Sequence, residues 1–260
     1  MTEPQIRFDD GAAYERMMGV WSQLAGKDFL AWLAPAPALR WVDVGCGNGA
    51  FTELFVDNCA PTEVQGVDPS DGQIAYARTR IPSVRFQTGD AMALPFPDRS
   101  FDVAVMALVI FFIPDPPKGV SEMVRVIAPG GLVAAYAWDM MGGGFPLQII
   151  GSELRDLGFS PPRPPSFEVS KVETLDALWK DVGLEDVSTC RIDVERSFVN
   201  FDDFWGSVSI APTLGAILES LKPDVLASLK ARVRARLSED AQGRVSYRAW
   251  ANAVKGRVPA

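Results

Sequence analysis

The chain has 260 residues, 48% of them hydrophobic, and a formal net charge of −8. This length and apolar content can bury the core of one large domain, so we expect a single domain over residues 1–260. The negative charge disfavours general nucleic-acid binding, because phosphates would be repelled. The sequence shows neither a run of about 18 apolar residues nor a basic-then-apolar leader, which favours a cytoplasmic protein without a membrane partner.

Histidine is absent from the sequence, and the three cysteines have no metal-like spacing. The commonest general base and metal ligand is therefore missing, so we expect no metal site and no triad or dyad built on histidine. Cys46, Cys59 and Cys190 fit reduced structural thiols. The mechanism must then use chemistry that needs neither a histidine nor a metal.

The segment 42–49 reads Val-Asp-Val-Gly-Cys-Gly-Asn-Gly, an apolar run that ends in three alternating glycines. This pattern predicts a strand, a tight turn and a helix over about 50–58. The glycines would permit the turn, the approach of a ligand to the backbone, and close helix packing. The amides of the helix N-terminus favour an anionic group. The turn indicates a nucleotide-type ligand, but the loose pattern Gly-x-Gly-x-x-Gly/Ala does not by itself identify it.

Further strands are expected in chain order. A second strand at 63–67 ends on Asp68, at the distance where an acidic residue reaches a ribose hydroxyl pair. A third strand at 84–87 precedes Asp90, whose carboxylate suits the amino donor of adenine. Strands at 101–109 and 131–138 follow, the second of them after the helix-stop signal Ala-Pro-Gly-Gly.

Four ordered motifs within residues 39–138 resemble those of the class I S-adenosylmethionine-dependent methyltransferases, specifically the small-molecule type 11 group. The motifs are segments 42–49, 66–78, 89–103 and 122–131. The resemblance implies an α/β fold with a Rossmann-like, doubly wound, seven-stranded sheet that is mostly parallel with an antiparallel last strand. It also implies in-line transfer of a methyl group from S-adenosylmethionine, with S-adenosylhomocysteine as the product.

The resemblance also implies roles for individual residues. Asp43 and the glycine turn would hold the methionine half of the cofactor, and Asp68 the ribose. Segment 90–92 would frame the adenine, and segment 107–108 would lie beside the sulfonium. The cofactor-binding residues implied in this way are Asp43, Gly45, Cys46, Gly47, Gly49, Asp68, Pro69, Asp90, Ala91, Met92, Ala107, Leu108 and Tyr14.

Segments on both sides of this core are expected to cover it. Residues 1–37 are predicted to form a helical cap, in which segment 14–22 resembles one that many relatives fold over the cofactor, with Val20 where they carry arginine. Residues 38–138 form the cofactor-binding core. Residues 139–170 are predicted to be a lid insertion, with segment 142–144 supplying backbone freedom; a floppy surface loop is the alternative. Residues 171–260 complete the sheet, with strands at 187–194 and 245–254 and a helical cover at about 201–237.

The covers carry the candidate residues for acceptor binding and catalysis. Side chains of the covers would form an apolar, aromatic wall for a small apolar or aromatic metabolite, although such residues are more often core. The substrate-binding candidates are Met18, Trp21, Phe112, Trp138, Met140 and Trp205. Asp139 and Tyr14 are weak candidates for a base, and Asp139 could instead cap a helix or turn.

Two other functions remain open at this stage. An NAD(P)-dependent oxidoreductase could use the same glycine turn, but no tyrosine is followed four residues later by the lysine that would shuttle a proton. A relative that binds S-adenosylmethionine without catalysis is the second. The sequence is compatible with a monomer or a homodimer.

Overall fold

The central sheet of the computed structural model, which describes residues 18–209 and 212–260, contains eight strands. Their order is β3-β2-β1-β4-β5-β8-β6, and the short β7 pairs with β8. The strands are β1 (Arg40–Val44), β2 (Glu63–Asp68), β3 (Arg85–Thr88), β4 (Phe101–Ala107), β5 (Ile127–Trp138), β6 (Glu185–Phe198), β7 (Ser238–Glu239) and β8 (Val245–Arg257). Strands β1 to β5 are parallel, and β8 runs antiparallel to both β5 and β6. The predicted Rossmann-like sheet with an antiparallel last strand is confirmed, with the two-residue β7 as an addition.

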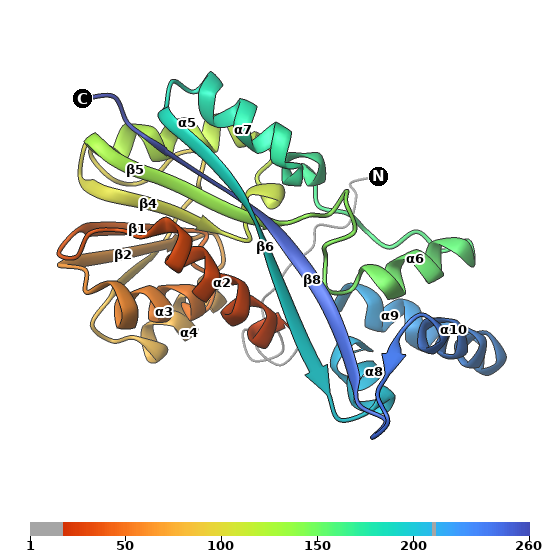
Figure 1. Cartoon of the computed structure of the whole chain (residues 1–260). Helices are drawn as coiled ribbons and strands as arrows, with labels where there is room; N and C mark the ends of the chain where they lie inside the picture. Colours follow the sequence, from red (N-terminus) through yellow and green to blue (C-terminus); the bar gives the residue numbers. More distant parts are fainter. Residues whose placement is uncertain (1–17, 210–211) are drawn as a thin grey trace.

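Helices cover both faces of the parallel half of the sheet, with α2, α3 and α4 on one side and α5 and α7 on the other (Figure 1). The helices, including two short 3-10 turns, are α2 (Val20–Leu33), α3 (Ala50–Cys59), α4 (Asp71–Arg80), η2 (Ile110–Phe112), α5 (Pro116–Val126), α6 (Gln148–Asp156), η3 (Phe167–Ser170), α7 (Val172–Asp181), α8 (Phe201–Ser209), α9 (Pro212–Ser220) and α10 (Pro223–Ala235). Among the described residues, no helix combines the length and apolar character needed to span a bilayer.

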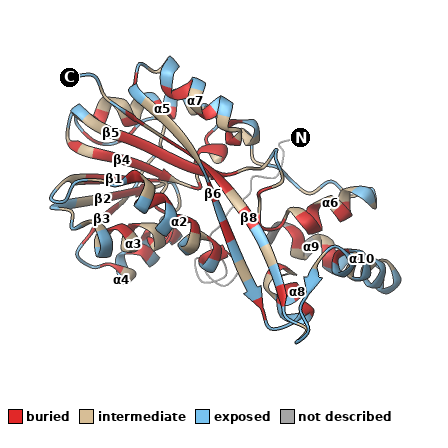
Figure 2. Cartoon of the chain, viewed as in Figure 1, coloured by how far each residue is buried: buried red, intermediate tan, exposed pale blue. Residues whose placement is uncertain are grey.

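The burial of the strands follows from this two-sided cover. Trp41, Val42 and Val44 of β1 are completely buried, as are Val103 and Val105 of β4. Parallel strands with helices on both faces have no solvent side, so their sequences are almost continuously apolar. Figure 2 shows buried residues concentrated in β4 and β5 and in the part of β8 beside them.

Side chains cap the N-termini of two helices, α4 and α5, in the parallel half of the sheet. The Ser70 hydroxyl accepts a hydrogen bond from the backbone N–H of Gln73 (3.3 Å) and caps the start of α4. At the start of α5, Asp115 accepts from the backbone N–H of Lys118, and Pro116 occupies the first helical position. These caps fix where each helix leaves the carboxyl edge of the sheet.

The antiparallel pair of long strands β6 and β8, called the β6–β8 hairpin below although helices connect the two strands, extends beyond the other strands. It carries a second group of helices (Figure 1). Helices α8, α9 and α10 lie between these two strands in the chain, where the sequence predicted a helical cover. Buried Glu153 of α6 accepts hydrogen bonds from Arg232 and Arg236 at the end of α10. The insertion after β5 is therefore fixed to the cover that the hairpin supports.

Candidate active site

The glycine turn lies at the carboxyl end of β1, between β2 and β4, where the strand order reverses. Ligands of open α/β sheets bind at such switch points. Gly45, Gly47 and Gly49 all have positive φ, at 76°, 51° and 81°. A Cβ on Gly45 would lie 2.5 Å from Cγ1 of Val109, and one on Gly49 would lie 3.3 Å from Cβ of Ala77. A Cβ on Gly47 would meet no described heavy atom within 4 Å, so this backbone is open to a ligand.

Asp68 ends β2 beside this turn. One carboxylate oxygen accepts from the backbone N–H of Gly47 (3.0 Å) and the other from that of Ser70 (2.9 Å). Burial raises the pKa of Asp68, and these two N–H donors lower it in part. Each carboxylate oxygen can accept a further hydrogen bond, so Asp68 can still receive donors from a ligand.

Asp43, at the buried end of β1, is the most perturbed acid near the turn. Its Oδ2 accepts from the Thr52 hydroxyl (2.6 Å), and its Oδ1 has no hydrogen-bond partner among the described residues. Burial is the main cause that raises the pKa of Asp43 to about 7; the Thr52 hydrogen bond lowers it and the charge of Asp68 raises it. A buried acid with a perturbed pKa in this position is a candidate for ligand binding.

The remaining cofactor candidates lie around the same edge. Asp90 follows β3, and its Oδ1 accepts from the backbone N–H of Met92 (2.8 Å). Ala91 lies between them, and Pro69 separates Asp68 from the α4 cap. Cys46 is buried, its thiol would lie 3.0 Å from a Cβ on Gly66, and burial raises its pKa well above the usual range. Cys46 is therefore a packing residue of the turn and not a nucleophile.

Ala107 ends β4, the strand next to β1 on its other side, and Leu108 follows it. Leu108 has a φ of 61°, and its N–H donates to the carbonyl of Tyr136 (2.8 Å). A branched residue in the left-handed region is strained, and such strain concentrates at functional sites. The next residue, Val109, packs under Gly45. Leu108 and Val109 thus form a wall with the glycine turn on one side.

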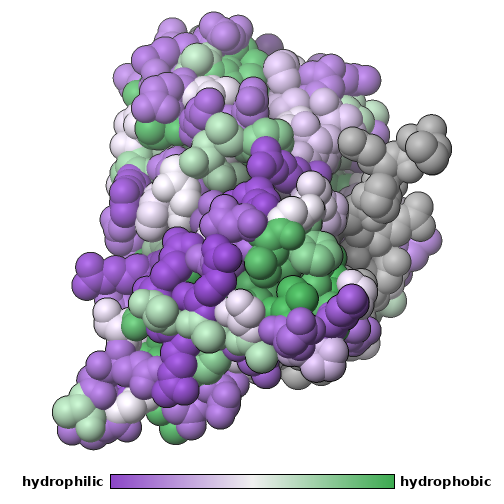
Figure 3. Space-filling model, turned by 90° about the vertical axis from the view of Figure 1, so that its right-hand side faces the viewer, coloured by the Kyte–Doolittle hydropathy of each residue, from purple (hydrophilic) through white to green (hydrophobic). Residues whose placement is uncertain are grey.

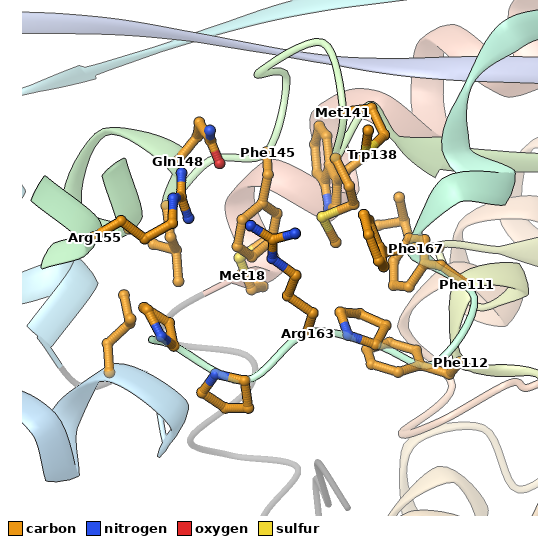
Figure 4. Close-up of a pocket in the computed structure, with 18 residues that line it drawn as sticks. Met18, Phe111, Phe112, Trp138, Met141, Phe145, Gln148, Arg155, Arg163 and Phe167 are labelled. Carbon is orange, nitrogen blue, oxygen red and sulfur yellow. The ribbon is translucent and has the colours of Figure 1, made fainter. Parts of the chain in front are cut away.

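Leu108 also lines a pocket of about 350 Å³. It is lined by Met18, Leu108, Phe111, Phe112, Trp138, Met140, Met141, Phe145, Leu147, Gln148, Gly151, Arg155, Pro161, Pro162, Arg163, Pro164, Phe167 and Leu214 (Figure 4). Most of these side chains are apolar or aromatic. Figure 3 shows hydrophobic side chains gathered in one area of a face that is otherwise largely polar.

Four of the six acceptor candidates line this pocket, namely Met18, Phe112, Trp138 and Met140. The other two pack elsewhere. Trp21 lies against Phe198 and Tyr247 of the hairpin, with ring centroids 6.4 and 6.1 Å away. Trp205 lies against Phe201, with Lys230 over its ring. Both tryptophans therefore pack within the part of the molecule formed by β6, β8 and the helices beside them, and not in the pocket.

Asp139 caps a turn, which was the alternative interpretation of this residue. Its Oδ1 accepts from the backbone N–H of Gly142 (2.6 Å), and its Oδ2 accepts from Nε1 of Trp250 (3.1 Å). It is not among the described residues that line the pocket. The other base candidate, Tyr14, lies outside the described residues. The described lining contains no acidic side chain.

The glycines 142–144, expected to supply backbone freedom, form a turn that is hydrogen-bonded to β8 through Gly144. Gly144 donates to the carbonyl of Asp139 (2.7 Å) and accepts from the N–H of Trp250 (3.0 Å). A Cβ on Gly144 would lie 2.3 Å from the carbonyl oxygen of Trp250. Glycine is needed here because the turn packs directly on β8, and the segment is anchored there by hydrogen bonds.

Comparison with known proteins identifies the part of the chain that carries the glycine turn. Residues 42–135 match a family model described as a methyltransferase domain. This segment is a methyltransferase domain. It contains Asp43, the glycine turn, Asp68, Asp90 and Leu108, whereas most of the pocket lies outside it.

Individual relatives support the same family. The chain is similar to demethylmenaquinone methyltransferase of Renibacterium salmoninarum, at 36% identity over 108 residues, or 41% of this chain and 45% of the relative. It is also similar to trans-aconitate 2-methyltransferase of Methylobacterium nodulans, at 37% identity over 115 residues and 43% of each chain. The chain thus matches less than half the length of these curated relatives.

The fold similarity extends over almost the whole chain. The phosphoethanolamine N-methyltransferase 2 of Haemonchus contortus, in complex with phosphomonomethylethanolamine and S-adenosylhomocysteine, aligns with a TM-score of 0.61 at 19% identity, covering 98% of this chain and 59% of its own. The [4+2]-cyclase SpnF aligns with a TM-score of 0.58 at 17% identity, covering 98% and 86%. Similarity at this level establishes the fold.

Several pocket residues were missed by sequence reasoning. Gln148, Arg155, Arg163 and Phe167 come from the segment after the methyltransferase domain, where no family motif assigns them. One signal was present: Arg163 stands between two proline pairs in segment 161–165. Proline fixes its backbone φ, so a charged residue held between prolines is presented in a restricted conformation.

Proposed function

We propose that this protein transfers a methyl group from S-adenosylmethionine to a small organic acceptor bound in the pocket. The neighbouring residues Leu108 and Val109 carry the proposal, because Val109 packs against Gly45 of the glycine turn and Leu108 lines the pocket. A donor bound at the turn and an acceptor in the pocket would meet at these two residues. Catalysis by positioning two reactants requires this kind of adjacency.

The residues around the turn fit the cofactor. The open backbone at Gly47 leaves room for it, and the free acceptor capacity of Asp68 suits the ribose hydroxyls. The Oδ1 atom of Asp43 could accept from the amino group of the methionine half. Asp90 offers acceptors near the adenine position at the next strand edge.

The chemistry asks little of the protein beyond alignment. When bound, S-adenosylmethionine supplies an electrophilic methyl carbon and a sulfonium leaving group. The pocket residues would orient the nucleophilic atom of the acceptor toward the Leu108 end and exclude water. Since the described lining contains no base, we infer that the acceptor atom loses its proton to solvent or reacts through a free lone pair.

The apolar and aromatic lining supports a small acceptor with an apolar body. The names of the two curated relatives refer to different acceptors, a quinone precursor and trans-aconitate, so they do not select one for this chain. Relatives of this fold also include a cyclase, which keeps a function without methyl transfer as the second candidate.

Thermal-shift assays with S-adenosylhomocysteine and NAD in parallel would test the cofactor assignment. We expect S-adenosylhomocysteine alone to raise the melting temperature, because a ligand that binds only the folded state stabilises it by mass action. Stabilisation by NAD alone would contradict the proposal and favour an oxidoreductase. Release of S-adenosylhomocysteine from S-adenosylmethionine in the presence of candidate acceptors would then distinguish a catalyst from a non-catalytic binder.

A further inference from the structure

The pocket combines an apolar interior with positive charge. Among the described lining residues, Arg155 and Arg163 carry the only charges and Gln148 the only other polar side chain apart from backbone groups. Figure 4 shows both arginine side chains pointing into the pocket from different segments, α6 and the proline-rich segment after it. The whole chain carries a net charge of −8, so this local positive charge has the opposite sign to the overall field.

The acids nearest to Arg155 on α6 are already paired with other residues. Glu153 accepts from Arg232 and Arg236, and Asp156 accepts from Arg232 at 3.4 Å. Neither Arg155 nor Arg163 has an ion pair with any described residue. The two guanidinium groups therefore face the pocket without a carboxylate from the described part of the chain.

Both arginines are held in place by their surroundings. An Nη atom of Arg155 lies 3.4 Å, an ordinary contact distance, from where a Cβ of Gly151 would be, so the guanidinium lies along the pocket-lining face of α6. Arg163 lies over the ring of Phe167, with Cζ 5.1 Å from the centroid, and prolines flank it on both sides. The flanking prolines restrict the backbone at Arg163, which lowers the entropy lost by this segment when a ligand is bound.

We propose that the acceptor is an amphipathic anion, with an apolar body in the pocket and an oxyanion group, carboxylate or phosphate, bound by Arg155 and Arg163. This inference rests on the proposed function, since it describes the acceptor of the same site. The guanidinium fork donates paired hydrogen bonds that match an oxyanion. The apolar body would lie against the aromatic and methionine side chains that make up most of the lining.

A matched pair of fluorescent probes tests the proposal without knowledge of the natural acceptor. 8-Anilinonaphthalene-1-sulfonate and N-phenyl-1-naphthylamine share an apolar body, and only the first carries an anion. Titrations with saturating S-adenosylhomocysteine keep the probes out of the cofactor site. We expect the sulfonate probe to bind roughly tenfold or more tightly than the neutral one, because hydrogen bonds to charged groups contribute about that factor.

The variants Arg155→Met and Arg163→Met, alone and combined, should remove this preference while leaving the affinity for the neutral probe unchanged. Arg85→Gln on the exposed edge of β3 removes one positive charge elsewhere and should have no effect. An intact near-ultraviolet circular dichroism spectrum would show that the variants fold. Equal affinity of the wild-type protein for both probes, or an undiminished preference in the double variant, would overturn the proposal.

Two further measurements are needed. The first distinguishes failure of this inference from failure of the proposed function, and the second distinguishes a carboxylate ligand from a phosphate ligand. The affinity for S-adenosylhomocysteine, measured by calorimetry without a probe, should be the same in the double variant and the wild type. A protein that does not bind S-adenosylhomocysteine but loses its sulfonate preference in the variants would refute the methyl transfer and retain the anion site. Competition by octanoate, octyl phosphate and octanol would rank carboxylate, phosphate and neutral head groups, and equal competition by octanol would contradict the anion site.

Discussion

The glycine turn and the pocket are linked by two neighbouring residues, Val109 against Gly45 and Leu108 in the pocket lining, yet the two regions are built in different ways. The turn and its acids lie within residues 43–92, and much of the binding surface is backbone whose shape the glycines set. The pocket draws its side chains from Met18, from segments 108–167 and from Leu214. A site made by local backbone geometry tolerates few changes in sequence, whereas a site made by side chains from covering segments can change its ligand and keep the fold.

The largest effect is expected from Asp68→Ala. Losing two charge-assisted hydrogen bonds to ribose, worth about 1.5–3 kcal/mol each, should weaken S-adenosylhomocysteine binding by roughly a hundredfold or more. Calorimetry would measure it, with Asp71→Ala in the next helix as the control that removes a nearby exposed carboxylate. An Asp68→Ala variant with wild-type affinity would refute the ribose assignment.

Asp90 should matter less, because its carboxylate is more exposed and reads a single amino group. Asp90→Asn keeps an acceptor, so we expect a loss of roughly 1–2 kcal/mol in S-adenosylhomocysteine affinity. Asp90→Leu should bind more weakly still. If both variants bind like the wild type in the same calorimetric assay, the adenine lies elsewhere.

The variants Gly47→Ala and Gly49→Ala should affect ligand affinity and folding stability to different extents, although both lie in the same turn. Both residues have positive φ, so each substitution should cost about 1 kcal/mol of folding free energy. The added methyl at Gly49 also presses on Ala77 of α4, whereas at Gly47 it occupies ligand space. We expect chemical denaturation to show the greater loss for Gly49→Ala, and ligand titration the greater loss for Gly47→Ala, by about tenfold. The reverse ranking would place the ligand on the other side of the turn.

The pH dependence of binding should report Asp43. If its carboxylate accepts from the amino group of the cofactor, affinity for S-adenosylhomocysteine should fall as pH drops through about 7, where the carboxyl gains its proton. The expected loss is about tenfold per pH unit at most. Asp43→Asn should bind with little pH dependence in this range. A wild-type profile as flat as that of the variant would remove Asp43 from the cofactor site.

The same titration affects stability in the opposite sense. Folding raises the pKa of Asp43 from 3.8 to about 7, so the folded state holds the proton more tightly than the unfolded chain. This contribution to stability is present below pH 3.8 and is lost as pH rises to about 7. Denaturation midpoints of the wild type and Asp43→Asn should therefore converge toward the acidic end and differ most above neutral pH.

The two regions also differ in how far the sequence predicts them. The turn, the strand ends with Asp68 and Asp90, and the Ser70 cap depend on contacts between residues close in the chain or in adjacent parallel strands, so motif and spacing locate them. The pocket depends on which face of a helix or strand meets a distant segment. Trp21 and Trp205 were expected in the acceptor site because aromatic spacing does not reveal that Trp21 packs against β6 and β8 and Trp205 against residues of α8 and α10. Arg155 and Arg163 were missed because their place in the pocket lining depends on how α6 and segment 161–165 lie relative to residues 108–112.

The position of β8 in the sheet has a consequence for how the chain folds. Strand β8 lies between β5 and β6 but follows both in the chain, with α8, α9 and α10 in between. Until β8 pairs, β5 and β6 each present an open edge of unpaired backbone groups, the kind that recruits other chains. Closing the gap requires long-range contacts, which form slowly because the intervening loop must first lose its entropy. Nascent or refolding molecules should therefore aggregate through β5 and β6 in the interval before β8 is inserted.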